Sequence, residues 1–414
     1  MDYGLIGEKL GHSFSKEIHE QLGGYAYELR EVARDELDAF MKARAFTGIN
    51  VTIPYKQQVI PYLDQIDESA KKIGAVNTIV HRDGKLYGYN TDYFGLKELI
   101  QSRFDLSGKK VLILGSGGTS KTALAVCRDL GAKEIKRVSR SAEDADTVSY
   151  TQAVKETDTQ FLINTTPCGM YPDIDARAID LSAFPKLSGV IDVIYNPLRT
   201  RLMIQAMQLG IPCVGGLMML VFQAAAAMSY FTGQEADDDS VREVYASIRA
   251  QRENIVLTGM PGAGKSTVGK LLAKKLGMDY VDTDEMIVER EGRAITDIFA
   301  ADGENAFRQM EAEVAKELAC RNHTVIATGG GFILNPECEK AMKAYGRVIF
   351  LDRNPETIRP TDDRPLADEA AKIRKLYEER LPRYQRIADH IIPVNGTPED
   401  VMRAITEVMK SGES

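Results

Sequence analysis

Cysteine and histidine are scarce and widely spaced in this sequence. The 414 residues include five of each, and no two cysteines form a Cys-x-x-Cys pair. Such spacing indicates neither a disulfide framework nor a structural zinc site, and it is typical of a reducing cytoplasm. The N-terminal stretch MDYGLIGEKLGHSFS carries charges where a signal peptide needs an apolar run, so we expect a cytoplasmic protein.

A block of basic residues is also missing. Lysine and arginine number 52 against 60 aspartates and glutamates, a net charge of −8, so we expect no nucleic acid partner. The uncharged segment from Leu202 to Gln234 is long enough to span a bilayer, but Gly210 and Pro212 interrupt it and its second half is only weakly apolar. We therefore expect no membrane span.

The length and the hydrophobic pattern predict two or three α/β domains. In the first half, short apolar strands such as DYGLIG, GINVTIP and KKVLILG alternate with helical patterns. The strands EIKRVSR, FLINTT and GVIDVIY follow KKVLILG at the spacing of a doubly wound parallel sheet. A polar segment then precedes a helix that Asp239 or Ser240 could cap, and a new strand, NIVLTG, begins at Asn254.

The strand, glycine loop and helix pattern restarts at Asn254, with further strands near DYVDTD, TVIATGGG, GRVIFLD and HIIPVN. We therefore place a boundary near residue 253. The predicted lobes are an α/β substrate lobe at 1–100, completed by helices at about 220–253, a Rossmann-type lobe at 101–219, and a P-loop domain with a central parallel sheet at 254–414. The oligomeric state stays open between monomer and homodimer.

Residues 259–266, GMPGAGKS, match the phosphate-binding motif G-x-x-x-x-G-K-[ST] between a predicted strand and a predicted helix. Glycines there let backbone N–H groups surround phosphates, Lys265 neutralises their charge, and Ser266 is suited to Mg²⁺. The motif therefore predicts a bound nucleotide. The expected contacts are Gly262, Ala263, Gly264, Lys265, Ser266 and Thr267.

Two acids, Asp282 and Asp284, stand at the end of the next predicted strand. Asp282 could complete the Mg²⁺ shell while Asp284 accepts a proton from a substrate hydroxyl, because phosphoryl transfer depends on positioning and charge neutralisation. Aspartates at strand ends also cap helices, so both interpretations stay open.

Together the P-loop, DTD, IFAADGENAFRQME, ATGGGF, RPL and RLPRY resemble shikimate kinase over about residues 254 to 410. The resemblance implies ATP and Mg²⁺ as cofactors, and it implies a set of residues that hold shikimate: Asp284, Arg308, Gly330, Gly331 and Arg380. It also implies that Arg364 is a lid arginine that closes on the transferring phosphate and that Arg359 lies against adenine. The segment from Arg359 to Arg380 is shorter than the usual lid.

A second glycine loop, Gly115-Ser-Gly117-Gly118-Thr-Ser, is related to the dinucleotide motif G-x-G-x-x-G and has a predicted strand and helix on its two sides. The next strand ends in Ser139 and Arg140 rather than in an acid. Because an arginine at this position suits the 2′-phosphate of the cofactor, the sequence favours NADP over NAD.

Hydroxyl, amide, lysine and aspartate side chains gather at strand ends and loops of the first 100 residues. These groups suit a polyhydroxylated acid as substrate. Reduction of a carbonyl needs a proton donor as hydride arrives, and Lys56 held by Asp92 could supply that proton. A plain surface lysine is the alternative interpretation of Lys56.

These motifs, with Asn164-Thr-Thr, Asp192-Val-Ile-Tyr195 and GLMMLVFQ, resemble shikimate dehydrogenase over about residues 1 to 250. The resemblance makes Lys56 and Asp92 the catalytic pair. It implies that 3-dehydroshikimate is bound by Ser13, Ser15, Thr52, Asn77, Asp92, Tyr195 and Gln223. It implies that NADP is bound by Glu68, Gly115, Ser116, Gly117, Gly118, Thr119, Ser139, Arg140, Thr165, Val193 and Gly216, with Ser139 where the family usually has asparagine.

The two halves together predict a bifunctional enzyme of aromatic amino acid biosynthesis. NADPH would reduce 3-dehydroshikimate to shikimate, and ATP would then phosphorylate the new hydroxyl. The expected catalytic residues are Lys56, Asp92, Lys265, Asp284 and Arg364. Two alternatives stay open: one half is a non-catalytic binding or regulatory module, or the first half is an NAD-dependent quinate dehydrogenase.

Overall fold

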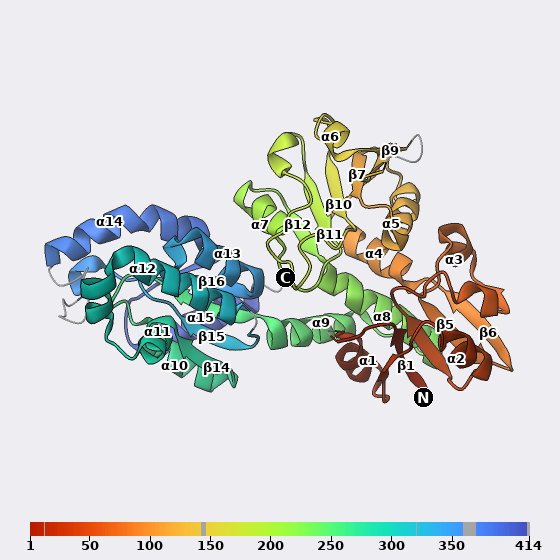
Figure 1. Ribbon diagram of the computed structural model, residues 1–414, viewed down its shortest axis with the longest axis horizontal. Helices are drawn as coiled ribbons and strands as arrows, with labels where there is room; N and C mark the ends of the chain where they lie inside the picture. Colours follow the sequence, from red (N-terminus) through yellow and green to blue (C-terminus); the bar gives the residue numbers. More distant parts are fainter. Residues whose placement is uncertain (12, 142–145, 320, 359–369, 412–414) are drawn as a thin grey trace. The chain divides into compact units, whose positions relative to one another are not determined.

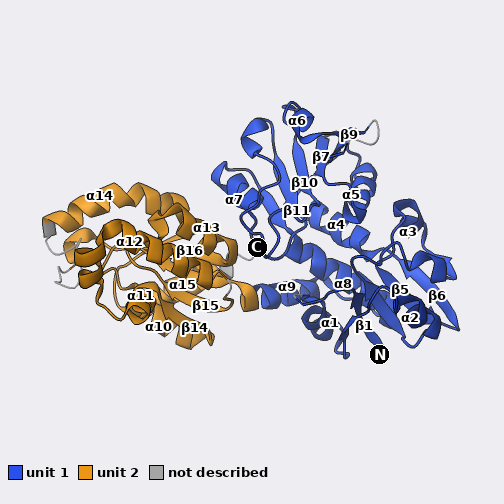
Figure 2. Cartoon of the chain, in the orientation of Figure 1, with its two compact units in different colours: residues 1–249 blue, residues 250–414 orange. Residues whose placement is uncertain are grey.

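The computed structural model divides the chain into two compact units (Figure 2). The residues that it describes are 1–11, 13–141, 146–319, 321–358 and 370–411. Unit 1 comprises Met1–Arg249 and unit 2 comprises Ala250–Ser414. The division therefore lies in the last turn of helix α9 (Asp238–Arg252), slightly before the boundary that the sequence pattern indicates.

The first sheet of unit 1 is mixed and has the strand order β2-β1-β3-β5-β6-β4 (Figure 1). Strand β1 runs parallel to β2 and β3, whereas β5 pairs antiparallel with β3 and β6. The strands are β1 (Tyr3–Gly7), β2 (Glu28–Glu31), β3 (Gly48–Val51), β4 (Gln65–Ile66), β5 (Thr78–Arg82) and β6 (Lys85–Tyr89). The short helices of this lobe are α1 (Ser15–Gly23), α2 (Leu37–Ala43), η1 (Ile60–Tyr62) and α3 (Glu68–Ile73).

The second sheet of unit 1 is wholly parallel in the order β12-β11-β10-β7-β8-β9, as the doubly wound prediction requires. Its strands are β7 (Lys110–Leu114), β8 (Glu134–Val138), β9 (Thr147–Val148), β10 (Phe161–Asn164), β11 (Gly189–Asp192) and β12 (Cys213–Gly215). The helices are α5 (Gly118–Asp129), α6 (Tyr150–Ala153), η2 (Leu181–Ala183) and α7 (Arg201–Gln208). The central strands β10 and β11 are buried throughout, because helices cover both faces of a parallel sheet.

Helices α4 (Thr91–Gln101) and α8 (Gly216–Thr232) lie side by side (Figure 1). Their close approach requires Gly95, since a Cβ at that position would lie 2.5 Å from the carbonyl oxygen of Met219. Helix α8 contains most of the uncharged segment, and it packs against α1, α4, β3 and β5. Among the described helices, none is long and apolar enough to cross a membrane.

The start of α9 corrects one expectation. Asp237 Oδ1 accepts a hydrogen bond from the backbone N–H of Ser240 at 2.7 Å, so Asp237 provides the capping carboxylate and neither Asp239 nor Ser240 does. The helix therefore begins earlier than the sequence indicated. Its apolar face, which includes Val241, Val244 and Ile248, is buried in unit 1.

Unit 2 is built on one parallel sheet in the order β14-β15-β13-β16-β17. Its strands are β13 (Asn254–Thr258), β14 (Asp279–Asp282), β15 (Thr324–Ala327), β16 (Gly346–Asp352) and β17 (His390–Pro393). Its helices are α10 (Lys265–Leu276), α11 (Thr283–Glu291), α12 (Ile295–Leu318), η3 (Phe332–Leu334), α13 (Pro336–Tyr345), η4 (Pro355–Thr357), α14 (Ala370–Ile387) and α15 (Pro398–Ser411). The backbone of α12 is interrupted at Gly303, whose φ is 79°.

An ion pair is buried where β13 and β16 begin. Glu253 Oε2 accepts from Arg347 Nη2 at 2.8 Å, and the two side chains are 6% and 4% exposed. The guanidinium also donates through Nη1 to the carbonyl oxygen of Met409 in α15 at 3.2 Å. Arg347, near the start of β16, therefore connects this strand to the residue before β13 and to the final helix of unit 2.

Candidate functional site

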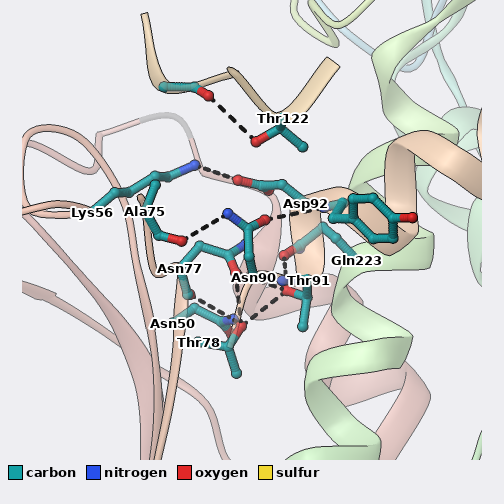
Figure 3. Close-up of polar contacts among 12 residues, drawn as sticks. Asn50, Lys56, Ala75, Asn77, Thr78, Asn90, Thr91, Asp92, Thr122 and Gln223 are labelled. Carbon is teal, nitrogen blue, oxygen red and sulfur yellow. Dashed lines mark hydrogen bonds and ion pairs between the residues drawn. The ribbon is translucent and has the colours of Figure 1, made fainter. Parts of the chain in front are cut away.

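The first candidate site lies in unit 1, where the adjoining ends of β3 and β5 meet the start of α4 (Figure 3). Lys56 follows β3, and its carbonyl oxygen accepts from the N–H of Val76 at 2.8 Å, which fixes the backbone of the turn. Lys56 Nζ donates to Asp92 Oδ2 at 2.6 Å, with 23% and 14% of the two side chains exposed. The structure thus brings the predicted pair together, with the ammonium group held at a half-enclosed position.

Amide and hydroxyl groups form a buried network beside this pair (Figure 3). Asn77 Oδ1 accepts from the N–H of Thr91 at 2.7 Å, and Thr91 Oγ1 donates to Gln223 Oε1 of α8 at 3.3 Å. Asn90 caps α4 by accepting from the N–H of Tyr93 at 3.1 Å, and it donates to the carbonyl of Ala75 at 2.9 Å. The predicted substrate residues Asn77, Asp92 and Gln223 are therefore joined through the first turn of α4.

Two other predicted substrate segments meet through an aromatic contact. Ser13 Oγ accepts from the N–H of Ser15 at 3.2 Å where α1 begins. The ring of Phe14, between these serines, lies 5.2 Å from the ring of Tyr195, and burial raises the pKa of the Tyr195 hydroxyl. Thr52 directly follows β3 on the same lobe. Tyr195 lies in the loop after β11, a strand of the second sheet. This loop and the serine segment are therefore neighbours.

The glycine loop between β7 and α5 has the features of a dinucleotide site. Gly115 has a φ of 114°, and a Cβ there would lie 2.8 Å from Thr165 Oγ1, so only glycine allows these two predicted contacts to approach. Gly117 precedes α5, whose first residues are Gly118 and Thr119. Apart from the adjacent residues and the backbone of α5 itself, no described atom lies within 4 Å of a Cβ built at Gly117 or Gly118, so the helix N-terminus is open to an anion.

Other predicted cofactor contacts form pairs around this loop. Ser139 Oγ donates to Ser116 Oγ at 3.3 Å, and Arg140 follows at an exposed position. A Cβ at Gly216 would lie 2.0 Å from the carbonyl oxygen of Val193, so these two predicted contacts also touch. Glu68 lies elsewhere, at the start of α3, where its exposed carboxylate pairs with Lys71 at 2.9 Å. Its cofactor role stays a prediction.

Asp192 is a functional candidate that the sequence analysis did not assign. Its fully buried carboxylate accepts from Thr200 Oγ1 at 2.6 Å, Asn164 Nδ2 at 3.0 Å and the N–H of Ile194 at 3.1 Å. Burial raises its pKa to about 6, against the opposing effect of these hydrogen bonds. Asp192 thereby fixes the backbone that leads to Tyr195. The signal in the sequence was an acid at the end of the apolar run GVID.

The second candidate site lies at the carboxyl end of β13 in unit 2. Gly264 caps α10 with a φ of 97°, and Lys265 and Ser266 are the first two residues of the helix. Lys265 Nζ donates to the carbonyl oxygens of Gly259 at 3.0 Å and Met260 at 2.9 Å, so its charge lies inside the loop. Of the remaining predicted contacts, Gly262 and Ala263 belong to this loop and Thr267 is the third residue of α10. The open loop and its buried ammonium group fit a nucleotide phosphate chain.

Ser266 and Asp282 bring a hydroxyl and a carboxylate oxygen together. Ser266 Oγ donates to Asp282 Oδ2 at 2.7 Å, and hydroxyl and carboxylate oxygens are what Mg²⁺ prefers. Asp282 Oδ1 meanwhile accepts from the N–H groups of Asp284 at 3.0 Å and Glu285 at 3.4 Å. The carboxylate therefore caps α11 with one oxygen, which confirms the capping interpretation for Asp282, and it faces Ser266 with the other. Its Mg²⁺ role stays a prediction.

A pocket beside the P-loop collects the predicted shikimate contacts: Asp284, Arg308, Gly330, Gly331 and Arg380. Arg380 Nη1 donates to the carbonyl oxygen of Gly330 at 3.1 Å, and a Cβ at Gly331 would lie 2.4 Å from Arg308 Nη1. The glycines thus leave room for the arginine. Two guanidinium groups at one pocket suit a carboxylate ligand.

The same pocket contains two carboxyl groups. Asp284 Oδ1 is buried without a hydrogen-bond partner among the described residues, and burial, then the charge of Asp282, raises its pKa to about 6. Glu311, which the sequence analysis did not assign, pairs through Oε2 with Arg308 Nη1 at 2.7 Å, and burial raises its pKa to about 7. Arg359 and Arg364, the predicted adenine and lid residues, lie outside the described residues.

The chain is similar to known proteins over both units. The family model for the shikimate dehydrogenase substrate binding domain matches residues 5–79, and the model for shikimate kinase matches residues 261–410. The shikimate dehydrogenase (NADP(+)) of Clostridium perfringens is 38% identical over 268 residues, which cover 60% of this chain and 98% of that protein.

Solved structures resemble unit 1. A chorismate mutase/shikimate 5-dehydrogenase fusion protein from Clostridium acetobutylicum is 36% identical with a TM-score of 0.57, over 59% of this chain and 96% of that one. Shikimate 5-dehydrogenase from Thermus thermophilus, in complex with NADP(H) and shikimate, is 29% identical with a TM-score of 0.55, over 60% and 99%. The chain therefore belongs to the shikimate dehydrogenase family through unit 1 and carries a shikimate kinase domain in unit 2.

Proposed function

We propose that the chain catalyses two steps of the shikimate pathway: reduction of 3-dehydroshikimate to shikimate by NADPH in unit 1, and phosphorylation of shikimate by ATP in unit 2. The observation that carries the proposal is that each unit gathers its own reactive groups. These are the Lys56–Asp92 pair in one unit, and Lys265 with the Ser266–Asp282 pair in the other. The NADP-dependent relatives of unit 1 support the choice of cofactor.

In unit 1, NADPH, when bound, would supply a hydride for the carbonyl carbon of the substrate. The carbonyl oxygen must gain a proton in the same step, and Lys56 Nζ is the proposed donor. Asp92, 2.6 Å away, keeps the ammonium group oriented, and its negative charge is only partly exposed to solvent. Asn77, Gln223 and the hydroxyl groups of the network would bind the ring hydroxyls.

In unit 2, ATP and Mg²⁺ supply the phosphoryl group and part of the charge neutralisation. Ser266 and Asp282 are the proposed Mg²⁺ ligands, and Lys265 would neutralise phosphate oxygens. Arg308 and Arg380 would hold the shikimate carboxylate, which leaves a ring hydroxyl toward Asp284. Asp284 would accept the proton of that hydroxyl, and the hydroxyl oxygen would attack the terminal phosphorus of ATP with ADP as the leaving group.

The test uses the purified full chain and two assays. We expect shikimate-dependent reduction of NADP⁺ and shikimate-dependent release of ADP from ATP. Lys56→Ala should abolish the first activity alone, and Lys265→Ala the second alone. The exposed Lys274, also on α10, gives a matched control that should leave both activities intact.

Each alternative predicts a different result. Absence of one activity in the unaltered chain would identify that unit as non-catalytic. Preference for quinate and NAD⁺ would identify unit 1 as a quinate dehydrogenase. Loss of both activities in either lysine variant would contradict two independent sites.

A further inference from the structure

A series of buried hydrogen bonds connects the residue before β2 to the predicted substrate residues of unit 1. Tyr27, just before β2, is fully buried, and its hydroxyl donates to Asn50 Oδ1 at 2.7 Å. Asn50 lies on β3 and is 4% exposed. Its Nδ2 donates to Thr78 Oγ1 at 2.9 Å and to the carbonyl oxygen of Asn77 at 3.3 Å. Neither Tyr27 nor Asn50 is among the predicted ligands.

These bonds decide which end of the Asn77 amide can meet a substrate. Asn77 Oδ1 already accepts from the N–H of Thr91 at 2.7 Å, and the hydroxyl oxygens of Thr78 and Thr91 each lie 3.2 Å from the same Oδ1. The amide oxygen is therefore committed to the protein, and Nδ2 is the group left to donate to a substrate oxygen. Asn50 donates to the backbone carbonyl of Asn77, and Figure 3 shows both residues in the same network as Thr91.

Asn50 is in turn oriented by what it contacts. The Asn77 carbonyl can only accept, so the NH₂ end of Asn50 must face it and the oxygen must face Tyr27. Removal of the Tyr27 hydroxyl would leave that buried oxygen short of a donor, which is unfavourable enough to shift the side chain. A shift of Asn50 is transmitted to Asn77 and Thr78 because it bonds to both.

We propose that Tyr27 and Asn50 are positioning residues for shikimate in unit 1, acting through Asn77. This inference rests on the proposed dehydrogenase function. The hydroxyl of Tyr27 bonds to Asn50, which is not a predicted ligand, so its effect is on the orientation of a donor and not on the proton or hydride that moves. Its removal should therefore weaken substrate binding in the ground state and the transition state alike, which raises KM and spares kcat.

The neighbouring Tyr25 provides a matched control. Its hydroxyl bonds to His19 Nδ1 at 2.7 Å, and the His19 ring stacks on Tyr27 with centroids 4.1 Å apart. Tyr25→Phe and Tyr27→Phe thus each remove one hydroxyl from the same aromatic cluster and keep the ring. Only the second removes a hydrogen bond to Asn50.

The experiment measures steady-state kinetics of both activities in the full chain. For Tyr27→Phe we expect KM for shikimate in the dehydrogenase reaction to rise about three- to tenfold, the range for one lost buried hydrogen bond, with kcat within about twofold. KM for NADP⁺ and the kinase activity should not change. Tyr25→Phe should leave all of these values unchanged. In an Asn50→Ala background, Tyr27→Phe should raise KM no further.

Several results would overturn the inference. Equal KM values in the two tyrosine variants would show that the hydroxyl of Tyr27 does not position the substrate. A fall in kcat at unchanged KM would assign it to the chemical step, and additive effects with Asn50→Ala would contradict the proposed series of hydrogen bonds. Absence of dehydrogenase activity in the unaltered protein would instead overturn the proposed function, and this inference with it.

Discussion

The burial of Asp284 predicts that its ionised carboxylate lowers the free energy of unfolding of unit 2. Burial raises its pKa from 3.8 to about 6. The difference is about two pH units, and at about 1.4 kcal/mol for each unit it amounts to about 3 kcal/mol. The pKa of Asp284 is higher in the folded chain than in the unfolded chain. The free energy of unfolding that its protonation contributes is therefore fully present below about pH 4 and is lost as the pH rises through 6.

Asp284→Asn removes this ionisation and keeps the shape of the side chain. We expect the variant to be more stable than the unaltered chain by about 3 kcal/mol at pH 8, and by about half as much at pH 5, where most of the folded carboxyl groups are already protonated. We also expect kinase activity to fall at least a hundredfold, since no carboxylate remains to accept the proton.

Native-state hydrogen exchange, read by mass spectrometry and corrected for the intrinsic rate at each pH, measures this in unit 2 alone. Peptides from β13 and β15 report on its core, while peptides from β7 and β10 and the dehydrogenase activity serve as internal controls. An equal gain at pH 5 and pH 8 would refute the reasoning, because it would show that ionisation is not the cause. A loss of stability at pH 8 would refute it as well.

Three further variants test other parts of the structure. Arg140→Ala should raise KM for NADPH about tenfold or more and leave KM for NADH unchanged, since a charge-assisted hydrogen bond contributes about 1.5–3 kcal/mol. Ser266→Ala should raise the Mg²⁺ concentration needed for half-maximal phosphorylation at least severalfold, with dehydrogenase rates as the control. Asp192→Ala leaves three buried donors without their acceptor and should lower the free energy of unfolding of unit 1 by about 3 kcal/mol in urea titrations.

The fold class could be predicted because the central strands leave a strong pattern. Buried parallel strands read as short apolar runs, and β7 and β13 each end directly at a glycine loop. Strands β4, β9 and β12 gave no such pattern, since segments of two or three residues at or near a sheet edge are too short to show a period. The helix cap was misplaced because the run Asp237–Ser240 offers several acceptors at adjacent positions.

Those residues of the candidate sites that belong to sequence motifs could be predicted. Residues such as Lys56 and Lys265 stand in patterns whose chemistry can be read locally. Tyr27, Asp192 and Glu311 were missed for a common reason, which is that the role of each depends on its burial. Distance in the sequence is not the cause, because Tyr27 bonds to Asn50 on another element whereas Glu311 pairs with Arg308 on its own helix. Burial itself leaves no mark on the sequence of a tyrosine or a glutamate, so tertiary structure was needed to identify them.

The ion pair between Glu253 and Arg347 decides where unit 2 can be separated from the chain. A fragment that begins at Asn254, as the strand pattern suggests, would leave the buried guanidinium without its carboxylate partner, and it would keep the hydrogen bond to the Met409 carbonyl. Loss of one partner of a buried pair costs about 3–5 kcal/mol, a large part of the stability of a small domain. A fragment that begins at Ala250 keeps the pair and also the carbonyl that accepts from His323 at 3.0 Å. A fragment that keeps both contacts therefore starts inside helix α9 and not at strand β13.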